Sequence, residues 1–406
     1  MISLALIPPA VVSAVAAILI STGSWIALGV EHAFGLPYAD LRYQLATADC
    51  YRVNPDWSPH TPTCDPYGRP NNYPTPWIWL YASIGATESA TNTFALIQMT
   101  LFVIALGGIS WLTVTTSRNP TASALMVSLA ACAPATWLAL ERGSTEVLIF
   151  FLVAASCLAF LKGSRWVAAV ALGVATVLKF YPVGAGFVFW PKNRYSWGPL
   201  IAYVSVVISG LVLILADLRI ILNQTPQPTG MAFGSSLFLR MHEVPFPRVL
   251  GVLIFFACVA LYVVLLNRPG LAALRHKTTD FVRGLRSDRV AAALVIYGGG
   301  CFTAAYLLGT NYDYRLICVI LLMAGLTHLW QFALAKWLLL FLALSVYGSF
   351  SAPDALEFAA DVLWVVVAPA IGLLVFFASV GVRYVPPLAP LSRYLVFSRA
   401  RRDSNP

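Results

Sequence analysis

Apolar runs long enough to cross a membrane recur along the whole chain, and they limit the fold more than any other feature. A helix needs about 20 apolar residues to cross the hydrocarbon core of a bilayer. The chain of 406 residues is 59% hydrophobic and 11% charged, whereas soluble domains average about 25% charged residues. The clear runs cover 7–30, 92–114, 121–140, 146–161, 199–218, 249–266, 290–308, 315–333, 337–350 and 359–381. This pattern predicts an all-α polytopic membrane protein without a sizeable soluble domain.

One further apolar run, 166–190, contains Lys179 and Pro182 near its middle. A single span would bury Lys179 near the bilayer centre, at a cost of at least about 2.5 kcal/mol. A hairpin of two short helices would place Lys179 at a membrane face instead. Lys and Arg flank the run on both sides, and loops rich in these residues are typically cytoplasmic. The hairpin is therefore preferred, and it predicts about 12 transmembrane helices, some of them short, with both termini cytoplasmic.

The charge distribution agrees with this topology. The assigned cytoplasmic side holds 17 of the 26 Lys and Arg residues but only three of the 17 Asp and Glu residues. The net charge of +9 therefore reflects topology, and no nucleic-acid partner is expected.

We expect one transmembrane domain over 1–382 and a basic cytoplasmic tail over 383–406. Within the domain lie a long first extracytoplasmic loop, 31–90, and a second, 219–247. The Trp and Tyr of the first loop favour short helices at the membrane interface. A basic cytoplasmic loop, 267–289, is expected to contact either anionic lipid head groups or solvent alone.

The seven cysteines fall into two groups. Cys50 and Cys64 share the first extracytoplasmic loop, where an oxidising compartment would permit a disulfide, with two free thiols as the alternative. The other five lie in apolar runs, and we interpret them as packing residues. No CxxC or HExxH motif accompanies the pair, so a zinc site is not expected.

Polar and ionisable residues gather where the topology places extracytoplasmic turns. They are Asp40 and Arg42 after the first run, Glu141, Arg142 and Glu146 in the stretch LERGSTE, Lys179 and Tyr181 at the hairpin, Arg240, His242 and Glu243 in the second loop, and Asn311, Asp313 and Arg315 in a late turn. Ionisable residues at membrane depth are usually paired and often functional. Charged helix ends are also common for structural reasons, in which case Glu141 and Arg142 form an ion pair across a short loop. The coincidence on one face favours a cavity that is open to the exterior and holds both acids and bases.

Such a cavity suits the chemistry of a phosphate group. A guanidinium binds phosphate with two parallel hydrogen bonds, and an ammonium binds it as a point charge. A separate carboxylate suits a general base that takes a proton from a hydroxyl. Several cations beside a carboxylate therefore predict transfer of a group from a lipid phosphate.

Five short stretches carry a resemblance to known enzymes. They are GLPYADLRYQL at 35–45, NNYPTPWIW at 71–79, LERGSTEVLIF at 140–150, ALGVATVLKFYPVG at 171–184 and NYDYRLICVIL at 311–321. Together they resemble the GT-C superfamily of glycosyltransferases that use polyprenyl-phosphate sugars, most nearly glycosyltransferase family 87, which includes mannosyltransferases. The third stretch departs from the family pattern Arg-Gly-Asn-x-Asp, because it has Ser144 for Asn and Glu146 for Asp.

The resemblance implies a GT-C-like bundle in the plasma membrane with its active site facing the periplasm or exterior. It implies inverting transfer of a hexose or pentose from a polyprenyl-phosphate donor to a lipid-linked or cell-envelope glycan acceptor. Asp40 would be the general base, and Arg142, Lys179 and Arg315 would hold the donor phosphate. The residues expected to bind substrate are Glu141, which would also orient Arg142, and Glu146, Tyr181, Asn311, Asp313 and His242. His242 is alternatively an ordinary surface residue. No cofactor is expected, with a divalent metal held by Asp40, Asp49 and Glu146 as the alternative.

Three other classes of membrane protein are alternatives. A polysaccharide polymerase or ligase usually carries its large outer loop late in the chain, whereas here the longest is 31–90. A transporter commonly shows internal repeats and charges at mid-membrane, and the sequence has no such repeat. A non-catalytic partner that kept the scaffold fits the departures at Ser144 and Glu146. The substitution Asp40→Asn separates an enzyme from such a partner.

Overall fold

The structure is a computed structural model that describes residues 1–23, 37–54, 64, 68, 73–191, 197–215, 217–218, 221, 232–308, 311–348 and 354–381. The described chain is mostly helical, with 3-10 helices labelled η. The expected cytoplasmic tail, 383–406, and the parts 219–220 and 222–231 of the second expected outer loop lie outside the described residues.

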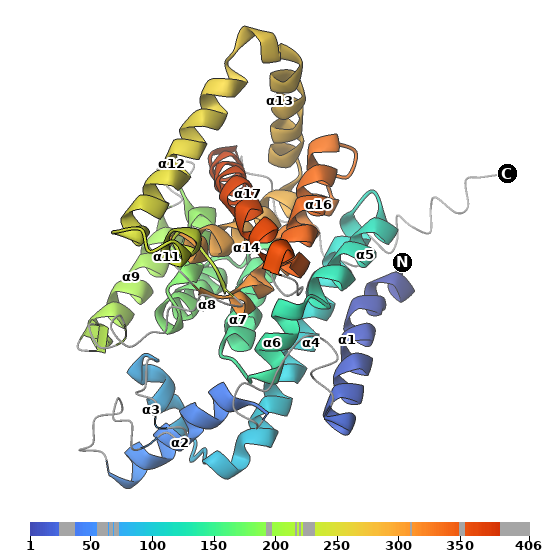
Figure 1. Cartoon of the computed structure of the whole chain (residues 1–406). Helices are drawn as coiled ribbons and strands as arrows, with labels where there is room; N and C mark the ends of the chain where they lie inside the picture. The colour runs from blue at the N-terminus through green and yellow to red at the C-terminus, as the bar shows by residue number, and fades with distance from the viewer. Residues whose placement is uncertain are drawn as a thin grey trace, which may run out of the picture.

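The first half of the chain forms a mixture of long and short helices (Figure 1). These are α1 (Ile2–Thr22), α2 (Ala39–Val53), α3 (Thr75–Ser83), η3 (Glu88–Ala90), α4 (Thr91–Thr116), α5 (Pro120–Ala131), α6 (Pro134–Glu141), α7 (Glu146–Leu161), α8 (Arg165–Leu178), η4 (Tyr181–Phe189) and α9 (Gly198–Leu213). Cys50 in α2 forms a disulfide with Cys64, with their Cα atoms 5.7 Å apart.

The second half contains the most buried helix and the described strands. Its elements are β1 (Ala232–Phe233), α11 (Leu237–Met241), α12 (Pro247–Leu266), η5 (Pro269–Leu271), α13 (Ala272–Ser287), α14 (Arg289–Leu307), β2 (Asn311–Tyr312), η6 (Asp313–Cys318), α15 (Val319–Thr327), α16 (Ala333–Gly348) and α17 (Asp354–Gly381). The two strands pair antiparallel, with Phe233 opposite Asn311. They therefore join the middle of the second expected outer loop to the late turn.

Five helical segments of the described chain are long and apolar enough to cross a membrane: α1, Glu88–Thr116, α12, α14 and Ala359–Ser379. The pair α5 and α6 also qualifies, with a bend of 49° at its break. The break is explained by Pro134, because a residue before proline avoids the α region and Ala133 is extended with ψ 145°. Shorter apolar helices make up the rest. The described chain thus has the character of a helical membrane protein.

The apolar run 166–190 is divided where the hairpin interpretation places its turn. Helix α8 ends at Leu178, and Lys179 is extended with φ −152° and ψ 128°. The second limb, η4, is a 3-10 helix with Pro182 in its first turn. It packs against α8 and α14, so the chain doubles back onto the bundle after Lys179.

Helix α14 forms the centre of the bundle. Every residue from Val290 to Phe302 is buried, and α14 packs against α7, α15, α17 and η4. A Cβ added to Gly300 would lie 2.3 Å from the carbonyl oxygen of Gly184 in η4. A Cβ added to Gly298 would lie 2.3 Å from the amide nitrogen of Leu322 in α15. Because these glycines have no side chain, the backbones of η4 and α15 lie close to α14, as at the small-residue contacts of membrane helix bundles.

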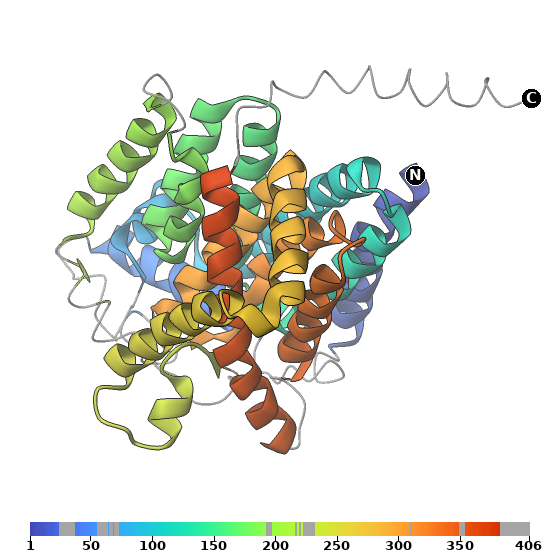
Figure 2. The ribbon, with the colours of Figure 1, turned by 90° about the horizontal axis from the view of Figure 1, so that it is seen from above.

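The bundle has two distinct ends. Helices α2 and α3 lie across one end, which we call the α2 end, and α13 rises at the other, the α13 end (Figure 1). Seen along the second direction, α1 beside α5 and α9 occupy opposite sides of the bundle (Figure 2). Helices α4 and α7 begin at the α2 end, whereas α14 begins at the α13 end. The loops before these helices therefore lie at one end of the bundle or at the other.

Candidate functional site

The turn between α6 and α7, within the stretch LERGSTE, is built around Gly143. Gly143 has φ 58°, a left-handed conformation that glycine adopts without steric penalty. The amide of Ser144 donates to the carbonyl of Ala139 at 2.9 Å, and the amide of Gly143 donates to that of Leu140 at 3.1 Å. These two bonds form a Schellman motif, which ends α6 sharply. The hydroxyl of Ser144 then accepts from the amide of Glu146 at 3.4 Å and helps to start α7.

The start of α2 docks on this turn. The amide of Tyr38 donates to the carbonyl of Glu141 at 2.7 Å, and the amides of Asp40 and Leu41 donate to the carbonyl of Arg142 at 3.0 and 3.3 Å. Amides in the first turn of a helix have no partner within the helix, so the turn supplies the acceptors for them. A Cβ on Gly143 would lie 2.8 Å from the Cβ of Leu41. The turn therefore fixes Asp40 beside Arg142.

Asp40 and Glu141 are both buried at this contact, with 5% and 2% of their surface exposed. Asp40 lies in the first turn of α2, where the helix dipole favours a negative charge. Burial first, and then the charge of Glu141, raise the pKa of Tyr38 above its usual value. The Tyr38 hydroxyl therefore stays protonated at neutral pH.

The carboxylate of Glu146 is the centre of the site. It is fully buried, and its Oε1 lies 3.5 Å from Nζ of Lys179 and 3.5 Å from Nε of Arg315. The hydroxyl of Tyr181 donates to Oε2 at 2.5 Å. One carboxylate thus faces two cations, which come from the end of α8 and from η6. The group carries a net positive charge when all three are ionised.

Helix α3 closes over the Lys179 turn. The ring of Tyr73 lies 4.4 Å from Nζ of Lys179, a cation–π distance. The indole of Trp77, which is buried, donates to the carbonyl of Leu178 at 3.2 Å. Asp217 accepts from the amide of Thr75 at 3.1 Å and so caps the start of α3. Lys179 consequently has aromatic and anionic neighbours, with 13% of its side chain exposed.

The structure brings most of the predicted residues to the α2 end. Lys179, Tyr181 and Arg315 meet at Glu146, and the charge of Asp40 acts on Lys179. Strand β2 and helix η6 carry Asn311 and Asp313 to the same region, but their side chains lie outside the described ones. His242 differs, because it ends the short helix α11 with an exposed side chain.

Three buried residues, two of them in this region, were not singled out from the sequence. Tyr73 and Trp77 lie in the stretch NNYPTPWIW, and the aromatic run before an apolar helix was the available signal. Asp361 in α17 is buried, with 6% exposed. A lone carboxylate within the apolar run 359–381 was the signal that marked it.

The alternative of a divalent metal on Asp40, Asp49 and Glu146 does not match this geometry. Two cations within 3.5 Å of Glu146 would repel a metal ion. Asp49 is paired with Arg52 on the partly exposed surface of α2. Among the described residues, no group of three or more His, Cys, Asp or Glu side chains comes together.

Comparisons with known proteins add no family to this geometry. A scan against models of protein families and a search of curated proteins both return no match for the chain.

Proposed function

We propose that the chain is a membrane glycosyltransferase that moves a sugar from a polyprenyl-phosphate donor to a lipid-linked or cell-envelope glycan acceptor. The Glu146 group carries this proposal, because one buried carboxylate faces two cations, Lys179 and Arg315, each 3.5 Å from its Oε1. Paired cations at one end of an apolar bundle suit a phosphate on a lipid carrier.

The reaction breaks the bond between the anomeric carbon and the donor phosphate. The acceptor hydroxyl attacks that carbon from the opposite side, and its proton passes to the carboxylate of Asp40. The electron pair of the broken bond leaves with the polyprenyl phosphate, so the configuration inverts. Negative charge grows on the phosphate as the bond breaks, and fixed cations therefore stabilise the transition state more than the bound donor.

Glu146 takes the role of a positioning residue in this mechanism instead of the substrate contact inferred from the sequence. Its carboxylate is fully buried and surrounded by Lys179, Arg315 and Tyr181. Such a carboxylate holds both cations in one place before the donor arrives, which reduces the reorganisation needed in the reaction. Arg142, whose backbone carries the start of α2, is the third candidate for the phosphate, and in this proposal Glu141 orients it.

The same proposal assigns the α2 end to the exterior and the α13 end to the cytoplasm, with about 12 membrane segments and both termini cytoplasmic. The apolar helices and the limbs of the Lys179 hairpin correspond to the apolar runs of the sequence. The disulfide between Cys50 and Cys64 at the α2 end supports an oxidising exterior.

The test is sugar transfer by the purified protein with a panel of polyprenyl-phosphate sugars. Asp40→Asn should reduce kcat by about 10²–10⁴-fold, the usual contribution of a general base. Asp49→Asn is the matched control, because Asp49 lies on the same helix but on its partly exposed face. It should leave kcat within about twofold of the wild type, since exposed pairs contribute little.

Two outcomes contradict the proposal. Activity that is equal in the wild type and in Asp40→Asn would remove Asp40 as the base. A folded wild-type protein that uses no donor in the panel would favour a polymerase, a ligase or a non-catalytic partner.

A further inference from the structure

A second polar site lies at the α13 end, far from Glu146 along the bundle. A pocket of about 370 Å³ opens between the loop after α4, helix α13, the start of α14 and the turn after α15. Arg118, Arg283, Asp288, His328, Gln331 and Phe332 are among the residues that line it. Its volume falls in the range of ordinary small-molecule sites, about 300–1,000 Å³.

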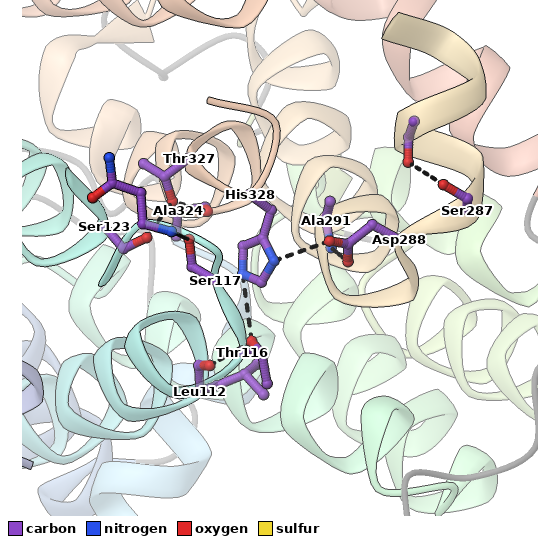
Figure 3. A network of polar contacts seen from close by, with 12 residues as sticks. Leu112, Thr116, Ser117, Ser123, Ser287, Asp288, Ala291, Ala324, Thr327 and His328 are labelled. Carbon is purple, nitrogen blue, oxygen red and sulfur yellow. Dashed lines mark hydrogen bonds and ion pairs between the residues drawn. The ribbon is translucent and has the colours of Figure 1, made fainter. Parts of the chain in front are cut away.

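The wall of this pocket is held by a polar network (Figure 3). Nδ1 of His328 lies 3.1 Å from Oδ2 of Asp288, and Nε2 lies 3.5 Å from the hydroxyl of Thr116. The hydroxyl of Ser123 donates to that of Thr327 at 3.0 Å. The network therefore ties the ends of α4, α5, α14 and α15 together around the pocket.

The loop that carries Arg118 is fixed by its neighbours on both sides. The hydroxyl of Ser117 accepts from the amide of Asn119 at 3.1 Å. The side chain of Asn119 accepts from the amide of Ala122 at 3.1 Å and so caps α5. An ordered backbone on both sides of Arg118 lowers the backbone entropy that is lost when a ligand binds to this loop.

Both acidic residues of the pocket already have partners. Asp288 accepts from the amide of Ala291 at 2.9 Å, in addition to its contact with His328. Asp280 lies 2.9 Å from Nη1 of Arg283 and 2.9 Å from Nδ1 of His276. A cationic ligand would have to displace these contacts.

In contrast to these acids, the hydrogen-bond donors of the pocket have few partners among the described residues. Arg118 makes no hydrogen bond or ion pair within the described part of the chain, although a guanidinium carries five donors. Arg283 has a single acidic partner and is 73% exposed, so most of its donors face solvent. Gln331 adds a neutral amide at the rim. The free donors of the pocket can thus bind a ligand that carries hydrogen-bond acceptors. Leu329 and Phe332 add an apolar side to the pocket.

We propose that this pocket binds a phosphate monoester or diester, with Arg118 and Arg283 as its charged ligands. Guanidinium groups match the geometry of phosphate with paired hydrogen bonds. Helix α13, which carries Arg283, also carries Arg275, Lys277 and Arg286. Such a basic helix concentrates anions at this end of the bundle. The phosphate belongs either to the head group of an anionic lipid or to a soluble phosphate ester, and the two sources are distinguished below. The site is independent of the proposed transfer reaction.

The experiment uses the full chain in nanodiscs of phosphatidylcholine, titrated with inorganic phosphate and with glycerol 3-phosphate by calorimetry. A parallel arm compares the thermal stability of the chain in phosphatidylcholine and in phosphatidylglycerol nanodiscs. We expect a saturable response in at least one arm. Arg118→Gln should weaken that binding by about tenfold or more, as loss of a charged hydrogen bond does, and Arg118→Lys should give an intermediate loss.

Arg268→Gln is the matched control, because it removes the same charge from an exposed arginine at the same end that does not line the pocket. It should change affinity by less than about twofold. Arg283→Gln is a second variant that should also weaken binding. A response to soluble phosphate assigns a soluble ester, and a response confined to phosphatidylglycerol assigns a lipid head group. Equal losses in Arg118→Gln and Arg268→Gln, or no response of the wild type in either arm, would overturn the proposal.

Discussion

At the α2 end, the carboxylate of Glu146 is fully buried between two cations, whereas at the α13 end the carboxylate of Asp288 is 34% exposed and faces one histidine. Asp288 also accepts a backbone hydrogen bond at the start of α14. The charge of Glu146 is therefore balanced by side chains that are distant in the sequence, whereas Asp288 also accepts a hydrogen bond from its own helix. At the α2 end, two cations around one carboxylate have a net positive charge that a ligand can use. At the α13 end, the positive charge available to a ligand comes from Arg118.

The largest expected difference follows from removing each carboxylate charge. Glu146→Gln keeps the shape of the side chain and an acceptor for Tyr181, but removes the negative charge that faces Lys179 and Arg315. Breaking a buried pair by removing one partner costs about 3–5 kcal/mol. We expect a loss of that size in the free energy of unfolding, measured in one detergent for all variants.

Asp49→Asn is the reference for that measurement, because Asp49 and its partner Arg52 are partly exposed, at 35% and 44%. It should lower the free energy of unfolding by at most about 1 kcal/mol. Similar losses in Glu146→Gln and Asp49→Asn would show that Glu146 does not depend on its cations.

A smaller effect is expected at the turn that carries the start of α2. Gly143→Ala and Gly23→Ala each place a side chain at positive φ, 58° and 66°, which costs about 1–2 kcal/mol. Only Gly143 also meets a neighbour, Leu41, at 2.8 Å, whereas nothing lies within 4 Å of a Cβ on Gly23. We expect Gly143→Ala to lose a further about 1–3 kcal/mol from overpacking. Equal unfolding free energies for the two variants would mean that α2 can retreat from the turn without loss.

The smallest expected effect is pH-dependent and belongs to the α13 end. Burial acts to raise the pKa of Asp288, but the hydrogen bond and charge of His328, with amides at the start of α14, outweigh it and lower that pKa. The unfolded carboxyl has a pKa of about 3.9. The stabilisation is therefore complete above about pH 5 and is lost as the pH falls through the lower, folded value.

Asp288→Asn keeps a good N-cap residue but removes the charge, so it should lose about 1 kcal/mol at neutral pH. Thermal unfolding from pH 6 to pH 3 should show the gap between wild type and variant closing at the acidic end. A gap that stays constant across this range would contradict the role assigned to the Asp288 charge.

The sequence predicted the helical membrane character and the break at Lys179, because apolar length and the position of charges are local properties. It also placed Lys179, Arg315 and Asp40 at one end, since loops alternate between the two ends of a bundle. It did not predict that Glu146 would pair with both cations, because that contact joins residues 33 and 169 positions apart, as numbered in the sequence. The His328 network was missed for the same reason, since Thr116 is 212 residues away from it.

The departures in LERGSTE illustrate what spacing alone leaves open. Ser144 stands where the pattern that this stretch resembles has Asn, and its hydroxyl accepts from the amide of Glu146. Glu146 stands where that pattern has Asp, and its longer side chain faces Lys179, Tyr181 and Arg315. Whether a changed side chain still reaches its partners depends on the positions of other helices, which a local pattern does not contain.

The contact between Gly184 and Gly300 has a consequence for how this chain can evolve. Each glycine already lies against the backbone of the other, so a side chain on either one clashes with main-chain atoms that cannot rotate away. No neighbouring substitution creates room for a first step at either position. The two sites are therefore expected to stay glycine together among descendants of this chain, even while the loops at both ends diverge.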